Sequence, residues 1–161
     1  RWGGGNTPLH VALENENITP AIIELLLSKD PNMVKVKNKM GNLLLHTAAS
    51  NKNMTKEMID LLISKGADPS EKSGYGDLPV MRAANGGNLA AFKRLFEITP
   101  GIDVNTKDQD GHTFLQGAML VNSVDIIEWL LNQPGIDTTS PVRRRYDNRR
   151  VPLLHEAVGL Y

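Results

Sequence analysis

The sequence contains no cysteine, which excludes disulfide bonds, cysteine-based zinc sites and a thiol nucleophile. It also lacks any apolar run of the roughly 18 to 20 residues needed to cross a bilayer, and its first residues do not resemble a signal peptide. The absence of thiols suits any compartment. We expect an intracellular, cytoplasmic protein that is not embedded in a membrane.

The chain also has no net charge and few aromatic residues. Acidic and basic residues balance to a formal net charge of +0, and aromatic residues make up 5% of the chain. Nucleic-acid recognition favours a basic surface, and binding of single strands favours stacking aromatics, so nucleic acid is an unfavoured partner. The chain does have 161 residues of which 40% are hydrophobic, enough for a packed core.

One short motif recurs about every 35 residues. Its occurrences are Thr7-Pro8-Leu9-His10, Leu43-Leu44-Leu45-His46, Leu78-Pro79-Val80-Met81, Thr113-Phe114-Leu115-Gln116 and Pro152-Leu153-Leu154-His155. Repetition at a nearly fixed spacing indicates one supersecondary unit stacked several times. Such a stack needs no deep central pocket and offers a long recognition surface.

Each unit is predicted to be a pair of antiparallel helices. A glycine stands two residues before each of the first four motifs, where a turn with positive φ is expected. Thr7 can cap the first helix, and Pro8 suits the first helical position. After a short polar break, Ile22, Ile23 and Leu26 show the spacing of a helix with one apolar face.

Together these features resemble the ankyrin repeat, whose pattern also includes an alanine pair such as Ala48-Ala49 and a Gly-Ala-Asp exit such as residues 66–68. The resemblance covers essentially the whole chain. It implies one domain, an all-α repeat solenoid of stacked antiparallel helix pairs with projecting β-hairpin-like loops. The repeats are expected at about 1–35, 36–70, 71–105 and 106–140, with a partial repeat at 141–161. Because the chain begins and ends within repeats, we expect it to be a fragment of a longer polypeptide.

The motif histidines are the obvious candidates for catalysis or metal binding. His10, His46 and His155 nevertheless recur at one position, where the family's histidine hydrogen-bonds backbone, so we interpret them as structural. Met81 and Gln116 replace this histidine in the third and fourth repeats. We therefore expect weaker local hydrogen bonding in that part of the stack.

No phosphate-binding loop, metalloprotease helix or nucleophile elbow is present. Asp103, Asp108 and Asp110 are close in sequence, but they lack the ligand set of a calcium loop, so a solvated turn is favoured. We predict no enzymatic activity, no cofactor and no metal site.

The loops between repeats are the predicted binding elements, because loop residues change without harming the core. In ankyrin-like stacks these loops project as fingers beside a concave face formed by the first helices. The family's usual contact positions correspond here to Lys39, Met40, Asn42, Tyr75, Asp77, Gln109, Asp110, His112, Asn148 and Arg149, with Glu14, Asn51 and Asn85 on first helices. The expected partner is another protein, or an absent domain of the same chain.

The loop before the fifth motif is unusually rich in arginine, with Arg143, Arg144, Arg145, Arg149 and Arg150. Arginine presents planar, multidentate donors that suit phosphate or carboxylate groups. We expect this loop to bind a polyanion or an acidic partner. The alternatives are a solvated finger, or arginines that pair with an absent domain.

The sequence favours a non-catalytic protein-binding module, acting as a scaffold or adaptor through its fingers and concave face. Two alternatives stay open. The chain could be the targeting or substrate-recruiting arm of a larger enzyme or channel, or it could bind polyanions through residues 143–150.

Overall fold

A computed structural model of the chain describes residues 5–143 and 150–151, with the backbone alone for 142–143 and 150–151. Eight α-helices are found in this part: α1 (Pro8–Glu14), α2 (Pro20–Lys29), α3 (Leu44–Ala49), α4 (Lys56–Ser64), α5 (Pro79–Gly86), α6 (Leu89–Ile98), α7 (Phe114–Leu120) and α8 (Val124–Leu131). A short 3-10 helix, η2 (Pro31–Lys35), follows α2.

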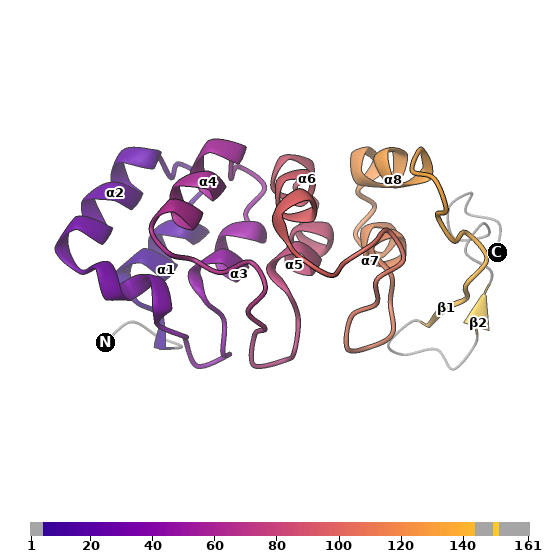
Figure 1. The fold of residues 1–161 in the computed structure, drawn as a ribbon, viewed down its shortest axis with the longest axis horizontal. Coiled ribbons are helices and arrows are strands. Elements are labelled where there is room, and N and C mark those ends of the chain that lie inside the picture. The colour runs from indigo at the N-terminus through magenta and orange to yellow at the C-terminus, as the bar shows by residue number, and fades with distance from the viewer. Residues whose placement is uncertain (1–4, 144–149, 152–161) are drawn as a thin grey trace.

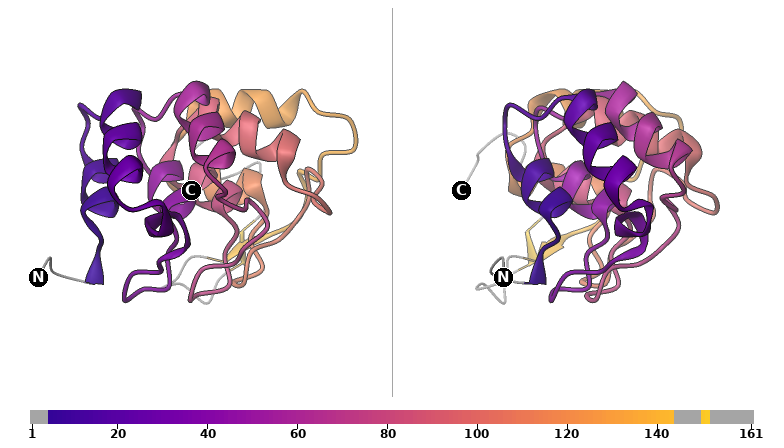
Figure 2. Two further views of the ribbon diagram at one scale, coloured as in Figure 1. Left: turned by 60° about the vertical axis from the view of Figure 1, so that its left-hand side comes forward. Right: turned by 90° about the vertical axis from the view of Figure 1, so that its left-hand side faces the viewer.

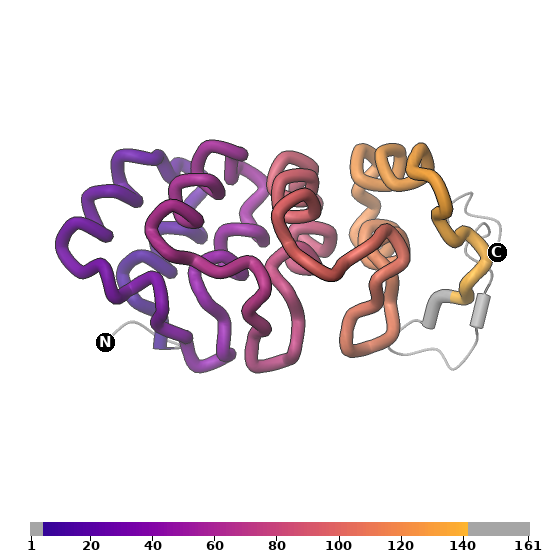
Figure 3. Tube along the Cα trace, in the orientation of Figure 1, coloured from indigo at the N-terminus to yellow at the C-terminus, as the bar shows by residue number. Residues whose placement is uncertain are grey.

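The helices form two layers (Figure 1). The first helices α1, α3, α5 and α7 lie side by side in one layer, the second helices α2, α4, α6 and α8 form the other, and the loops between repeats project to one side. The same stacking is clear in the backbone trace (Figure 3). This arrangement confirms the predicted solenoid of antiparallel helix pairs.

The helix starts follow the predicted chemistry. The Thr7 hydroxyl accepts a hydrogen bond from the backbone N–H of His10, and Pro8 occupies the first helical position. The glycine before each of the first four motifs has a positive φ, for example 70° at Gly41. A side chain at Gly41 would also collide with the backbone of Gly74 in the next loop, so glycine is required there twice over.

One continuous hydrophobic core lies between the two layers. It includes fully buried residues from both layers, such as Leu9, Ile59 and Leu115. Ala83 and Ala118 are completely buried on neighbouring first helices, where a small side chain allows close approach. Because every repeat packs on the next, the stack presents its loops in a fixed order.

An aromatic cluster joins the third and fourth repeats. The rings of Phe92 and Phe114 meet edge to face with centroids 5.3 Å apart, and Phe96 and Trp129 do the same at 5.4 Å. Such pairs stabilise by about 0.5–1.5 kcal/mol beyond the area they bury. These ring contacts therefore stabilise the third and fourth repeats, the two repeats whose motifs lack histidine.

The loops have hairpin character, as expected. Lys107 and Thr113 form an antiparallel bridge, and β1 (Val142–Arg143) pairs antiparallel with β2 (Arg150–Val151), placing Arg143 opposite Arg150. The other predicted residues of this region, Arg144, Arg145, Asn148, Arg149 and His155, lie outside the described residues, as does the first helix expected for the fifth repeat.

Among the helices in the described part of the chain, none combines the length and the apolar character that a bilayer crossing requires.

Candidate functional site

Within the part of the chain whose side chains the structure describes, three loops project between successive repeats (Figure 1). We name them finger 1 (36–42), finger 2 (71–77) and finger 3 (106–112). Each is held by one polar side chain that accepts hydrogen bonds from the backbone N–H groups two and four residues later, at 2.8 to 3.3 Å. These side chains belong to Asn38, Ser73 and Asp108. Turns of this kind fix the backbone without helix or sheet.

The role of these three side chains in holding the fingers was not predicted from the sequence. Their signal is a short polar residue three positions before the glycine of each loop, at Gly41, Gly76 and Gly111. The same pair of backbone hydrogen bonds recurs in all three fingers, whereas the residues at their tips differ. The fingers therefore share one backbone conformation and present different side chains.

Histidine side chains join each of the first two repeats to the finger that follows. The Nε2 atom of His10 lies 3.0 Å from the carbonyl oxygen of Asn42, and that of His46 lies 2.9 Å from the carbonyl oxygen of Asp77. The Nδ1 atom of His46 accepts the backbone N–H of Leu43 at 3.2 Å, so Nε2 carries the proton and donates. The structural interpretation of His10 and His46 is confirmed.

Burial decides the protonation state of these histidines. It lowers the pKa of His46 to about 4, the charges of Arg82 and Lys37 act in the same direction, and the bond to the Asp77 carbonyl opposes them. Burial likewise lowers the pKa of His10, against an opposing bond to the Asn42 carbonyl. Both rings are neutral at pH 7 with both nitrogens engaged, an arrangement suited to structure and not to proton transfer.

Gln116 links the fourth repeat to the loop that follows, as His10 and His46 do in the first two repeats. Its Oε1 atom accepts the backbone N–H of Thr113 at 2.8 Å, and its Nε2 atom donates to the carbonyl oxygens of Pro141 at 3.0 Å and Ser140 at 3.3 Å. The expected weakening of local hydrogen bonding is therefore wrong at Gln116. The amide oxygen and nitrogen reproduce the acceptor and donor of a neutral imidazole.

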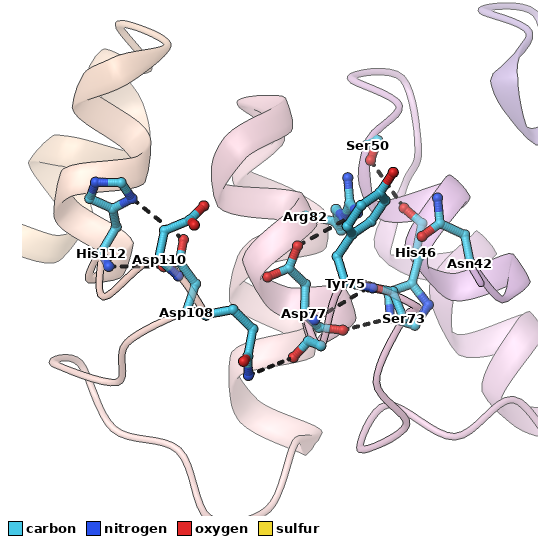
Figure 4. Close-up of polar contacts among 12 residues, drawn as sticks. Asn42, His46, Ser50, Ser73, Tyr75, Asp77, Arg82, Asp108, Asp110 and His112 are labelled. Atoms are coloured by element: carbon cyan, nitrogen blue, oxygen red, sulfur yellow. Dashed lines mark hydrogen bonds and ion pairs between the residues drawn. The ribbon is translucent and has the colours of Figure 1, made fainter. Parts of the chain in front are cut away.

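Finger 2 and helix α5 bring together three side chains of different chemistry (Figure 4). The guanidinium of Arg82 lies 3.5 Å from the carboxylate of Asp77 and 6.0 Å from the centroid of the Tyr75 ring. Tyr75 is 61% exposed. Partial burial raises the pKa of Asp77, and Arg82 opposes this effect. Arg82, which directly follows the divergent motif residue Met81, was not predicted from the sequence.

Finger 3 carries a second polar group (Figure 4). Ligand atoms of Asp108, Asp110 and His112 lie within 4.8 Å of one another. The Oδ1 atom of Asp108 already accepts two backbone N–H groups, and its Oδ2 atom lies 3.8 Å from Nδ1 of His112. Calcium takes six to eight oxygen ligands, which these three residues cannot supply. We assign the group to the shape and charge of the finger.

The structure divides the predicted contact residues into two groups. The exposed residues are Lys39, Met40, Tyr75, Gln109 and Asp110, all at or beside fingertips. Asn42, Asp77 and His112 are half-buried at the finger bases. The carbonyl oxygens of Asn42 and Asp77 receive the histidine bonds. Asp77 is further engaged by Arg82, so its role is to support the finger.

The three candidates expected on first helices differ from one another, and Asn51 lies after α3, which ends at Ala49. The side-chain amide of Asn51 donates to the carbonyl oxygens of Leu13 at 2.8 Å and Asn15 at 3.0 Å, so this residue ties two repeats together. Asn85 is exposed on α5. Leu120, which stands 35 residues after Asn85, is 49% exposed and was not predicted from the sequence.

A hollow of about 180 Å³ lies between finger 1 and the first helices. Its lining includes Glu14, Met40, Asn42 and Ser50. Glu14, another of the predicted residues, accepts a hydrogen bond from the Asn6 side chain at 3.4 Å. A hollow of this size between a fingertip and a helix row can receive a side chain of a partner, and it is smaller than the usual site for a small molecule.

Comparison with known proteins adds two findings. Residues 3–73 and 45–142 match the family model described as ankyrin repeats (3 copies). A segment of 38 residues is 50% identical to the I-Kappa-B like protein C2 of Microplitis demolitor bracovirus (isolate Webb). That alignment covers 23% of this chain and 21% of the viral protein, so it spans about a fifth of the relative's length.

Proposed function

The chain belongs to the ankyrin-repeat family, and from this we propose that it is a non-catalytic module that binds another protein through its fingers and the concave face of its first helices. The observation that carries the proposal is the construction of the fingers. Their bases are fixed by the repeated frame of Asn38, Ser73 and Asp108, while their tips are exposed and chemically different.

The proposed contact surface comprises Lys39 and Met40 on finger 1, Tyr75 on finger 2, and Gln109 and Asp110 on finger 3. Met40 is 49% exposed and Tyr75 is 61% exposed. Exposed aromatic side chains on a supported backbone are typical anchors at protein interfaces. Met40 and Tyr75 are therefore the proposed apolar anchors for a partner. Lys39 provides a positive charge on finger 1, and Asp110 provides a negative charge on finger 3.

Scaffold or adaptor activity in the cytoplasm is part of the same proposal, and the absence of cysteine is compatible with a reducing compartment. The single-domain organisation, with repeats near 1–35, 36–70, 71–105 and 106–140, also belongs to it. The continuous core supports that organisation.

The test begins with capture of a partner by the purified chain and continues with the isolated pair. Lys39→Glu, Tyr75→Ala and Asp110→Ala are each expected to weaken binding about tenfold or more, as measured by calorimetry. The matched control is Leu25→Ala, because Leu25 on the outer helix α2 is also 61% exposed. A partner that binds all three finger variants as well as it binds the parent chain contradicts this surface.

A further inference from the structure

The first repeat exposes a set of positions that the other three described repeats bury. The third residue of the second helix is one of them: it is Ile22 in α2, Met58 in α4, Ala91 in α6 and Ile126 in α8. Ile22 is 38% exposed, whereas Met58 is 4% exposed and the other two are completely buried. Among these four repeats, the position is therefore in contact with water only in the first.

Three further positions follow the same pattern, one on the second helix and two on the first. Leu26 is partly exposed as the seventh residue of α2, Pro8 is exposed as the first residue of α1, and Ala12 is partly exposed as its fifth. The corresponding residues of the later repeats are all buried, namely Leu62, Leu95 and Leu130 for Leu26, Leu44, Pro79 and Phe114 for Pro8, and Ala48, Ala83 and Ala118 for Ala12. We name Pro8, Ala12, Ile22 and Leu26 the stacking face.

The stack itself shows what covers these positions in the later repeats. First helices pack on neighbouring first helices, as α1 does on α3, and second helices pack on second helices, as α2 does on α4. Seen along the stack, α1 and α2 lie in front of the other helices (Figure 2, right). Among the described repeats only the first has no repeat before it, so the preceding helix pair is what buries the corresponding positions elsewhere.

The composition of the stacking face is that of a buried interface. All four of its residues are apolar, whereas a repeat that ends a stack needs a polar outer face to stay soluble. By contrast, one position that faces water in every described repeat holds only polar residues, the ninth after the N-cap of the second helix: Ser28, Ser64, Glu97 and Asn132. Covering the stacking face removes apolar surface from water, which is favourable.

We propose that the natural polypeptide carries a further ankyrin repeat ahead of Arg1 and that its helix pair packs on the stacking face. This contact repeats the one that α1 and α2 make with α3 and α4. A helix pair is the fitting occupant because the face spans both layers, with Pro8 and Ala12 on α1 and Ile22 and Leu26 on α2, whereas a single helix covers one layer. The fingers take no part in the contact, so it is independent of the protein-binding function proposed above.

The natural reading frame gives the first test. At a motif spacing of about 35 residues, the first helix of the added repeat begins about 30 residues before Arg1. We expect a helix-start motif there, followed by a second helix with the apolar spacing of Ile22, Ile23 and Leu26. A start codon fewer than about 25 residues upstream leaves no room for the helix pair and overturns the proposal, as does a frame without this pattern.

Substitution at the stacking face tests the contact itself, in this chain and in a longer natural chain that includes the upstream repeat. In the longer chain, Ile22→Asp should lower the melting temperature by about 5 °C or more, because the contact buries an unpaired carboxylate. In the shorter chain the carboxylate meets water, so the shift should be at most about half as large. Ala21→Asp is the matched control and should shift both chains by less than about 2 °C, because Ala21 and its counterparts Glu57, Ala90 and Asp125 are exposed.

Hydrogen exchange of the two unsubstituted chains completes the test, because it requires no variant to fold. The backbone amides of α1 and α2 should exchange about tenfold more slowly or better in the longer chain, since a covered end repeat opens less often. Slower exchange together with a larger effect of Ile22→Asp in the longer chain supports the added repeat. Unchanged exchange in α1 and α2 overturns the proposal, and so does an equal effect of Ile22→Asp in the two chains.

Discussion

Replacement of His46 by glutamine should preserve the link between the second repeat and finger 2 while removing its sensitivity to acid. Gln116 already shows that a glutamine at this position accepts the N-cap backbone N–H and donates to a carbonyl of the following loop. His46 makes the same two contacts, with Leu43 and Asp77. The substitution therefore exchanges a titratable group for a neutral one in the same place.

The magnitude follows from the pKa of His46. The unfolded chain binds a proton at this histidine near the ordinary pKa of 6.5, whereas the folded chain does so at about 4. Between these values the unfolded state holds more protons, so the free energy of unfolding falls as the pH falls. The stability that neutral His46 gives the folded chain is fully present above pH 6.5. It is lost as the pH falls from 6.5 to about 4. Between pH 7.5 and pH 4.5 the loss from His46 is about 2.5 kcal/mol.

Urea unfolding followed by circular dichroism at pH 7.5 and pH 4.5 measures this loss. Other groups, including His10, titrate in both proteins, so the difference between the two proteins isolates His46. The His46→Gln chain should lose about 2.5 kcal/mol less than the parent chain. His46→Ala is the comparison variant, because it leaves the Leu43 N–H and the Asp77 carbonyl without a partner. It should cost about 2–4 kcal/mol already at pH 7.5.

An equal acid-induced loss in the parent and His46→Gln chains would refute the argument, since His46 would then not be held neutral by burial. A large loss of stability in the His46→Gln chain at pH 7.5 would show that glutamine does not reproduce the hydrogen bonds of His46 to Leu43 and Asp77.

Two further predictions concern stability at neutral pH. Asp108→Ala should lower the free energy of unfolding by about 1–3 kcal/mol in urea titrations, because two backbone N–H groups of finger 3 lose their acceptor, whereas exposed Asp110→Ala should change it by less than about 0.5 kcal/mol. Equal effects would show that Asp108 does not hold the finger. Phe92→Ala should cost about 3–5 kcal/mol in thermal or urea unfolding, because Phe92 is completely buried and packs edge to face on Phe114 and Trp129. A cost below about 1 kcal/mol would mean that these rings do not hold the third and fourth repeats together.

Much of the proposed contact surface was predictable from sequence. The glycine and the helix-start motif locate each finger within a few residues, and the exposed tips Met40, Tyr75 and Asp110 follow from that register. The roles of Asn42 and Asp77 were not predictable in the same way. Their carbonyl oxygens are occupied by histidines more than thirty residues earlier in the chain.

The sequence by itself determined the repeat, the two helices of each unit and the face that each helix buries. These properties depend on capping, turn and periodicity signals within a few residues of one another, as Thr7 and Pro8 illustrate at α1. Only the tertiary structure decided that Gln116 replaces a histidine and that Arg82 supports Tyr75.

The structure alone also decided that Lys52 and Glu128, which belong to different repeats, line one hollow. Each of these relations joins atoms from different repeats or different elements. They exist because stacking places neighbouring units side by side, where side chains meet backbone groups that are remote in the sequence.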